Sequence, residues 1–409
     1  MQTQLAEWVR DTPQGREADA ILRRCVHCGF CLATCPTYNL LGDELDSPRG
    51  RIYLMKQMLE GGAVTRRTQV HLDRCLTCRA CETTCPSGVE YGRLVDIGRA
   101  LVAEKVPRSP WDRLRRGFLA RTLASRALFA AALAIGRALR PVLPRSLARG
   151  IPTRRAPGSW PAARHPRRMV ALAGCVQPAI APSINAAAAR VLDRLGVSLV
   201  EVPGAGCCGA VPFHLDDQDG GRARARANID AWWPHVEGGA EAIVITASGC
   251  GTMVKDYGHL LAGDAAYAAK AARISALAKD VSEVVAAERG RLAASLGEPA
   301  KRTRIAFHSP CSLQHGLRIN GVVEAILAGA GFELVPVADA HLCCGSAGTY
   351  SLLQPRLSKR LLRNKVRALE SGAPEIIATA NIGCLAHIGS GASRPVLHWI
   401  ELLDRRLAS

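Results

Sequence analysis

The chain has 409 residues, a formal net charge of +18 and 16 cysteines, and 48% of its residues are hydrophobic. This length predicts two or three domains, and the hydrophobic content is ample for their cores. The first twenty residues are polar and charged, without the apolar stretch of a signal peptide. Disulfides need an oxidising compartment, and nothing in the sequence suggests export. We therefore expect a cytoplasmic protein whose cysteines bind metal.

Two near-identical runs of cysteine organise the first hundred residues. Each reads C-x-x-C-x-x-C-x-x-x-C-P, the spacing typical of bacterial ferredoxins with cubane [4Fe–4S] clusters, whereas zinc sites usually pair two C-x-x-C units. In two-cluster ferredoxins the fourth cysteine of each run ligates the other cluster. The predicted ligands are therefore Cys25, Cys28, Cys31 and Cys85 for one cluster, and Cys75, Cys78, Cys81 and Cys35 for the other.

The residues around these runs have helical patterns. Ser47 is a good N-cap and Pro48 a good first residue for a helix that ends at a pair of glycines. Helices are also predicted over residues 18–24 and 89–103. We therefore expect a helical, ferredoxin-like domain over residues 1–104, with both clusters set among its helices.

Residues 105–168 form a strongly basic block, with sixteen Lys or Arg residues and one acidic residue, Asp112. Such a block suggests an anionic partner, but its few aromatic side chains argue against nucleic acid. A helix is predicted over residues 118–139, followed by a proline-rich linker. The longest uncharged run, residues 127–136, is too short to span a bilayer. Two interpretations stay open: a solvated connector with a packed helix, or an interfacial helix on anionic lipid.

From residue 169 onward the chain repeats itself. A strand leads to Cys175 and, 136 residues later, another leads to Cys311; a Cys-Cys-Gly sequence follows 32 positions after each. The equal shifts indicate an internal duplication, and alternating strands and helices predict α/β units with parallel sheets. The candidate ligands are Cys175, Cys207, Cys208 and Cys250 in the unit over residues 169–300, and Cys311, Cys343, Cys344 and Cys384 in the unit over residues 301–409.

The two cysteine runs, the Ser47-Pro48-Arg49-Gly50-Arg51 insert between them and the duplicated Cys-Cys-Gly units together resemble the iron–sulfur subunits of bacterial glycolate oxidases. The resemblance implies an α+β electron-transfer subunit of an oxidoreductase, glycolate oxidase or dehydrogenase, which is inactive alone and has no catalytic residue of its own. It implies that FAD or FMN on partner subunits oxidises glycolate to glyoxylate. The same flavin would oxidise D-lactate, a second 2-hydroxy acid, by the same kind of reaction. Electrons would then pass to a quinone at the cytoplasmic face of the inner membrane. No dinucleotide fingerprint is recognised in this chain, which agrees with a flavin bound elsewhere.

Broader relatives by resemblance are the iron–sulfur subunits of lactate utilisation, of anaerobic glycerol-3-phosphate dehydrogenase and of heterodisulfide reductase, whose repeat ends in C-x-x-C. Here Ala247 and Asn381 stand in place of the first cysteine of that pair. The four cysteines left in each unit could hold a cubane, a zinc ion or nothing. A related dehydrogenase subunit, a thiol–disulfide catalyst and a cluster-bearing sensor remain alternative functions. His308, His315 and His341 lie near the second unit. Two interpretations stay open for them, ligands or proton carriers on the one hand and core or surface residues on the other, and we favour the second because a single histidine has many structural uses.

Overall fold

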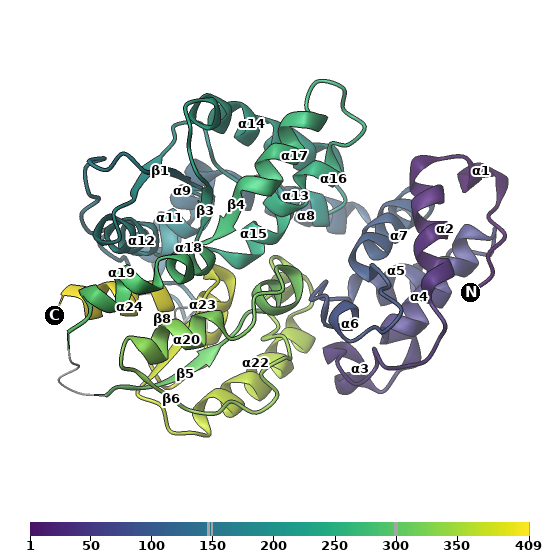
Figure 1. Ribbon diagram of the computed structural model, residues 1–409. Coiled ribbons are helices and arrows are strands. Elements are labelled where there is room, and N and C mark those ends of the chain that lie inside the picture. Colours follow the sequence, from purple (N-terminus) through teal and green to yellow (C-terminus); the bar gives the residue numbers. More distant parts are fainter. Residues whose placement is uncertain (145–147, 149, 298–301, 409) are drawn as a thin grey trace.

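The computed structural model describes residues 1–144, 148, 150–297 and 302–408. A helical N-terminal domain lies at one end of the molecule and two α/β repeats form the other, so that the two termini lie far apart (Figure 1). The predicted α+β class, with a helical domain followed by duplicated units with parallel strands, is confirmed. The predicted boundary between the repeats, at residue 300, lies outside the described residues.

Short helices surround both cysteine runs. The Ser47 hydroxyl accepts a hydrogen bond from the Gly50 N–H, so that Ser47 caps the helix that begins at Pro48, as predicted. The helix predicted over residues 18–24 begins earlier, because Thr12 caps it. The elements are α1 (Glu7–Arg10), α2 (Pro13–Arg24), α3 (Pro36–Leu41), η1 (Glu44–Asp46), α4 (Pro48–Leu59), α5 (Arg66–Asp73), α6 (Ala80–Thr83) and α7 (Tyr91–Lys105).

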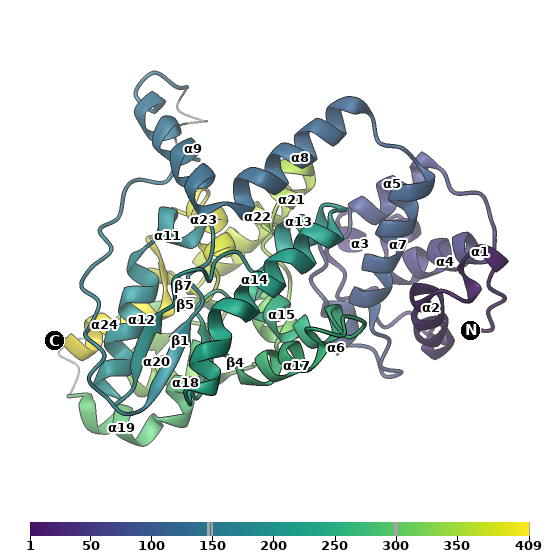
Figure 2. The same ribbon diagram turned by 90° about the horizontal axis from the view of Figure 1, so that it is seen from above.

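The basic block does not form the single helix predicted over residues 118–139. It forms α8 (Pro110–Ala124) and α9 (Arg126–Leu139), which are bent by 103° relative to each other (Figure 2). Ser125 causes the break, because its backbone is extended and its hydroxyl accepts a hydrogen bond from the Leu128 N–H at 3.3 Å. Within the described part of the chain, no single helix is long and apolar enough to cross a membrane, whereas this bent pair together meets that test of length and composition. Four linker positions, 145–147 and 149, lie outside the described residues.

Each repeat contains a four-stranded parallel sheet. The strand orders are equivalent, β2-β1-β3-β4 in the first and β6-β5-β7-β8 in the second. The strands are β1 (Arg168–Ala171), β2 (Ser198–Glu201), β3 (Ile243–Ile245), β4 (Ala278–Asp280), β5 (Arg304–His308), β6 (Glu333–Leu334), β7 (Ile376–Thr379) and β8 (Val396–His398). Strands β4 and β8, each at one edge of its sheet, were not predicted from the sequence.

Helices and one-turn segments flank both sheets. They are α11 (Gln177–Ile180), α12 (Ser183–Arg194), α13 (Ala210–His214), α14 (Gln218–Glu237), α15 (Ser248–Lys255), α16 (Tyr257–Leu260), α17 (Ala268–Leu277), α18 (Val281–Ala287), α19 (Arg289–Ser295), η2 (Ser312–Gly316), α20 (Val322–Gly329), α21 (Tyr350–Leu353), α22 (Pro355–Glu370), α23 (Ile382–Gly389) and α24 (Trp399–Ala408). One hydrophobic core spans both repeats. Across it α12 packs on α24, where the Arg190 guanidinium lies 2.6 Å from the Asp404 carboxylate. The two repeats therefore form one body.

Asp280 is a buried carboxylate at the end of β4 that caps α18. One of its oxygens accepts hydrogen bonds from the Ser282 N–H at 2.9 Å and hydroxyl at 2.6 Å, while Oδ2 has no partner among the described residues. Burial raises the pKa of this carboxyl from 3.8 to about 6. The folded chain therefore binds this proton more tightly than the unfolded chain does. The resulting stability is complete below pH 3.8 and is lost as the pH rises through about 6.

Asp280→Asn keeps a capping oxygen and removes the buried charge. We expect it to raise the free energy of unfolding at pH 7 by on the order of 1–3 kcal/mol and to abolish the decline in stability between about pH 4 and 6. Denaturant unfolding across this pH range measures both effects. Asp280→Ala is the control, because it removes the cap together with the charge. An asparagine variant no more stable than the parent at pH 7 would contradict the prediction.

Candidate metal centres

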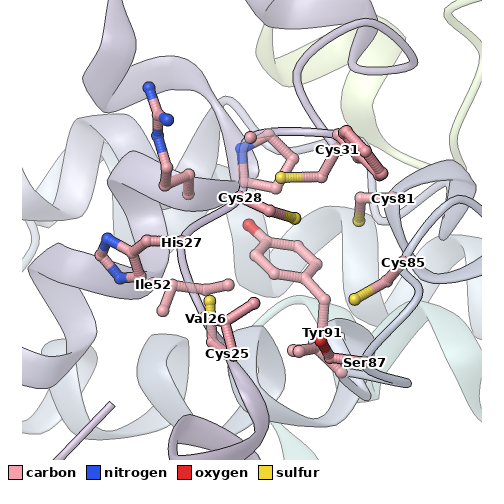
Figure 3. Close-up of a pocket in the computed structure, with 15 residues that line it drawn as sticks. Cys25, Val26, His27, Cys28, Cys31, Ile52, Cys81, Cys85, Ser87 and Tyr91 are labelled. Atoms are coloured by element: carbon pink, nitrogen blue, oxygen red, sulfur yellow. The ribbon is translucent and has the colours of Figure 1, made fainter.

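The first cysteine pocket lies between the loop after α2 and the segment after α6. Cys25, Cys28, Cys31 and Cys85 line it, together with Tyr91. Their sulfur atoms point into a common space (Figure 3). Cys25 is buried and Cys28 is exposed, so that this pocket reaches the surface of the protein.

The second pocket borders the first. Cys35, Cys75, Cys78 and Cys81 line it, and Pro48, Cys81 and Tyr91 line both pockets. The structure thus brings together the two sets of four cysteines that the sequence groups. Four thiolates around one space are the ligand set of a [4Fe–4S] cluster, so the residues present fit two such clusters. That these cysteines are the ligands remains a prediction.

Both cysteine loops have the same unusual backbone. His27 and Gly29 have φ values of 56° and 84°, and the corresponding Thr77 and Arg79 have values of 51° and 58°. For the three residues that are not glycine, this left-handed conformation costs roughly 1–3 kcal/mol each. The geometry turns N–H groups toward sulfur, as in the Thr77 N–H, which lies 3.4 Å from Cys75 Sγ. The same strained conformation, present twice, is therefore consistent with two loops shaped to hold a ligand.

Burial shapes the acid–base chemistry of the thiols. It raises the pKa of Cys31 to about 11 and also raises the pKa of Cys78 and of Cys81. These thiols are therefore protonated near neutral pH in the metal-free chain. Because thiolates are the metal ligands, loading the pockets would release protons.

A buried arginine lies beside the second pocket. The Arg51 side chain is 1% exposed, lines this pocket, and donates hydrogen bonds to the Thr37 hydroxyl, the Asp46 carboxylate and the His71 carbonyl. Burial alone would lower its pKa, but Tyr91 and the pocket cysteines raise it on balance. This fixed positive charge would stabilise the reduced state of a cluster bound in the pocket. Sequence reasoning missed this role, although Arg51 belongs to the insert on which the resemblance rests.

Each repeat gathers its own four cysteines at the carboxyl ends of its strands. In the second repeat, Cys311 Sγ lies 3.8 Å from Cys343 Sγ. The thiol of Cys343 also forms a hydrogen bond with the thiol of Cys344, which in turn forms one with the thiol of Cys384. The first repeat has the same series of thiols, in the order Cys175, Cys207, Cys208 and Cys250.

The backbone conformation and close packing require a glycine at the end of each Cys-Cys-Gly sequence. Gly345 has a φ of 90°, and its N–H donates to Cys343 Sγ at 3.4 Å. A Cβ atom there would lie 2.9 Å from the Ser358 carbonyl oxygen and 2.8 Å from Leu361 Cβ. Gly209 has the equivalent conformation in the first repeat. Only glycine therefore lets the loop turn its amide toward the thiol while α22 packs against it.

Asn381 occupies the position of the missing fifth cysteine. Its amide nitrogen donates to Cys384 Sγ at 3.6 Å, and its oxygen accepts a hydrogen bond from the Gly249 N–H in the first repeat at 3.2 Å. This side chain therefore links the two repeats beside their cysteines.

The second pocket also borders the second repeat. Cys78 and Cys311 pack in one small hydrophobic cluster with Leu76, Cys343 and Tyr350. Burial and, after it, the neighbouring Cys311 raise the pKa of Cys78. Three groups of cysteines are therefore contiguous: the first pocket, the second pocket and the second repeat.

Comparisons with known proteins agree with this organisation. Residues 21–89 match the family described as 4Fe-4S dicluster domain, and residues 169–255 and 305–389 match the family described as Cysteine-rich domain. The chain is 54% identical over 408 residues to the glycolate oxidase iron-sulfur subunit of Escherichia coli (strain K12), covering 100% of this chain and 99% of that protein. The probable glycolate oxidase iron-sulfur subunit of Bacillus subtilis (strain 168) is 30% identical, with 91% and 89% covered.

A more distant relative covers part of the chain. Lactate utilization protein A of Exiguobacterium sp. (strain ATCC BAA-1283 / AT1b) is 28% identical over 245 residues, which are 56% of this chain and 94% of that protein. The near-complete coverage by the glycolate oxidase subunits, together with the dicluster and cysteine-rich domains, decides the family. The chain belongs to the family of glycolate oxidase iron–sulfur subunits.

Proposed function

We propose that this chain is the electron-transfer subunit of a complex that oxidises glycolate to glyoxylate. The complex would also oxidise D-lactate, which is a 2-hydroxy acid like glycolate. The observation that carries the proposal is the pair of adjacent pockets that the eight cysteines of the two runs line together, with Cys81 and Tyr91 lining both pockets. [4Fe–4S] clusters held there would supply one-electron transfer. A 2-hydroxy acid loses two electrons together, conventionally as hydride to a flavin or nicotinamide. FAD or FMN on partner subunits would therefore take the electrons from the substrate, and a quinone would finally accept them.

The surface around the first pocket supports contact with an electron-transfer partner. Val26 and Phe30, which flank the exposed Cys28, are 68% and 61% exposed. Exposed large apolar side chains that lie together often mark an interaction site. The cysteines of the second pocket are buried or half-buried, and this pocket borders the second repeat, so the first pocket is the better placed of the two for exchange with another subunit.

The direct test is the metal content of the full chain purified without air. We expect at least about eight irons with matching sulfide, as two [4Fe–4S] clusters require. Cys28→Ser and Cys78→Ser should each remove the signal of one cluster from the EPR spectrum of the reduced protein. Val26→Ser is the matched control in the same loop and should keep both signals. Protein that contains zinc and no iron would overturn the proposal.

The α8–α9 pair supports peripheral contact with an anionic membrane. Helix α9 projects from the body of the repeats (Figure 2). Both helices expose apolar and basic side chains. Trp111 is 72% exposed, Phe118 64% and Ile135 62%. Part of the basic charge is not available, because Arg108 and Arg116 pair with Asp73, Asp112 and Asp216. The exposed arginines that remain in this pair and just after it are Arg113, Arg121, Arg126 and Arg140.

Binding to vesicles that contain anionic lipid tests this contact. Each well-placed arginine is expected to contribute roughly 1 kcal/mol, and binding should weaken with added salt, because salt screens exposed charges. The double variant Arg121→Gln, Arg126→Gln should therefore bind several-fold more weakly. Arg363→Gln with Arg367→Gln, on the exposed side of α22, is the matched control and should bind like the parent. No binding, or binding that does not depend on salt, would favour the connector interpretation.

A further inference from the structure

The second repeat brings a histidine to its cysteines. Ligand atoms of His308, Cys344 and Cys384 all lie within 4.8 Å of one another, and all three residues are buried. His308 is the last residue of β5, at the carboxyl end of the strand, where the cysteines of the repeat also gather. One imidazole nitrogen and two thiolates at this spacing can bind a common metal ion.

Among the residues that the structure describes, no other partner explains the position of His308. The residue is 1% exposed, and neither ring nitrogen has a hydrogen-bond partner among the described residues. A buried polar group without a partner costs roughly 1–3 kcal/mol. The sheet register pairs His308 with Thr379 on β7, whose hydroxyl is also buried and without a partner in the described structure. Two buried polar side chains without partners in the described structure therefore lie at paired positions of the sheet.

The first repeat differs at both of these positions. Leu172 lies three residues before Cys175, as His308 lies three residues before Cys311. Ile245 lies five residues before Cys250, as Thr379 lies five before Cys384. Leu172 and Ile245 pack together in the core of the first repeat. The fold thus accepts two apolar residues here, so the polar pair of the second repeat is not needed for folding.

We propose that the second repeat holds a metal centre with mixed imidazole and thiolate ligands, in which His308 binds the metal beside Cys344 and Cys384. Cys343 continues the series of thiols next to Cys344 and offers a further ligand. The metal is a transition metal ion that suits thiolate and imidazole together, either iron in an iron–sulfur centre or zinc. The first repeat lacks the imidazole, so the two repeats have different metal chemistry. This proposal does not depend on the substrate of the complex.

Metal analysis of the full chain, purified without air, tests the proposal. His308→Leu introduces the residue that the first repeat has at this position. We expect the iron or zinc content to fall by the share that the second repeat holds, while the EPR signals of the two ferredoxin-type clusters are unchanged. Cys384→Ser should lower the metal content by the same amount. The double variant His308→Leu, Cys384→Ser should contain no less metal than either single variant. Cys250→Ser, in the first repeat, is the control, and its effect on metal content should be independent of His308.

Spectroscopy then identifies the ligand and the metal. If the metal is iron, pulsed EPR of the paramagnetic state should show coupling to a directly bound nitrogen, which shifts when histidine is labelled with ¹⁵N. If it is zinc, X-ray absorption at the zinc edge should show nitrogen and sulfur ligands together. His308→Cys should restore the metal and lose the nitrogen signal. Two results would overturn the proposal: a parent protein without metal beyond the ferredoxin-type clusters, or a His308→Leu variant with unchanged metal and spectra. Neither result would affect the proposed electron-transfer role, because the ferredoxin-type clusters are counted separately.

Discussion

Cys78→Ser is expected to nearly abolish electron transfer through the assembled complex while substrate still reduces the flavin at its normal rate. Cys78 lines the second pocket and packs in the same cluster as Cys311 and Cys343 of the second repeat. The second pocket therefore borders both the exposed first pocket and the second repeat. We expect electrons that pass between these two places to cross it, in whichever direction they flow.

Stopped-flow spectroscopy can follow flavin reduction and acceptor reduction separately in the purified complex. In Cys78→Ser the first step should be unchanged and the second should fall to near background. Cys28→Ser should have the same effect, because it removes the cluster expected in the exposed first pocket. Thr34→Ser, beside the second pocket, keeps all cysteines and serves as the control. Normal acceptor turnover by Cys78→Ser would show that this pocket is not on the electron path.

The purified chain alone is expected to show no oxidation of glycolate or D-lactate. Iron–sulfur centres accept electrons singly, whereas a 2-hydroxy acid loses two together to a flavin or nicotinamide. The sequence carries no recognisable dinucleotide fingerprint and no evident base to take the proton of the substrate. Activity should appear only when the flavin-bearing partner subunits are added.

An acceptor-dye assay can make this comparison with the chain alone, the partners alone and the assembled complex. The chain must first be shown to contain its iron, so that an inactive preparation is not mistaken for a result. Chemically reduced chain should pass electrons to the dye, which is the positive control. Glycolate oxidation by the chain alone would refute its assignment as an electron-transfer subunit.

The sequence by itself determined the features that depend on short spacings or on exact repetition. The cysteine runs predict metal pockets because three of the four thiols of each set lie within seven residues. A loop this short can bring the three thiols together in few conformations. The equal shift between repeats predicts two similar sheets, which the parallel orders β2-β1-β3-β4 and β6-β5-β7-β8 confirm. The helix at Pro48 was predictable because its capping residue, Ser47, is adjacent in sequence.

Only the tertiary structure decided the features that join distant residues. Arg108 lies in the basic block, yet Asp73 and Asp216 neutralise it, and no local pattern signals that pairing. The contact between Cys78 and the second repeat joins positions more than two hundred residues apart and arises from the packing of whole domains. The sequence did not single out His308 beside Cys344 and Cys384, because these thiols come near it only in the folded repeat. Spacing along the chain thus determines local ligand sets, whereas packing decides which of them are neighbours.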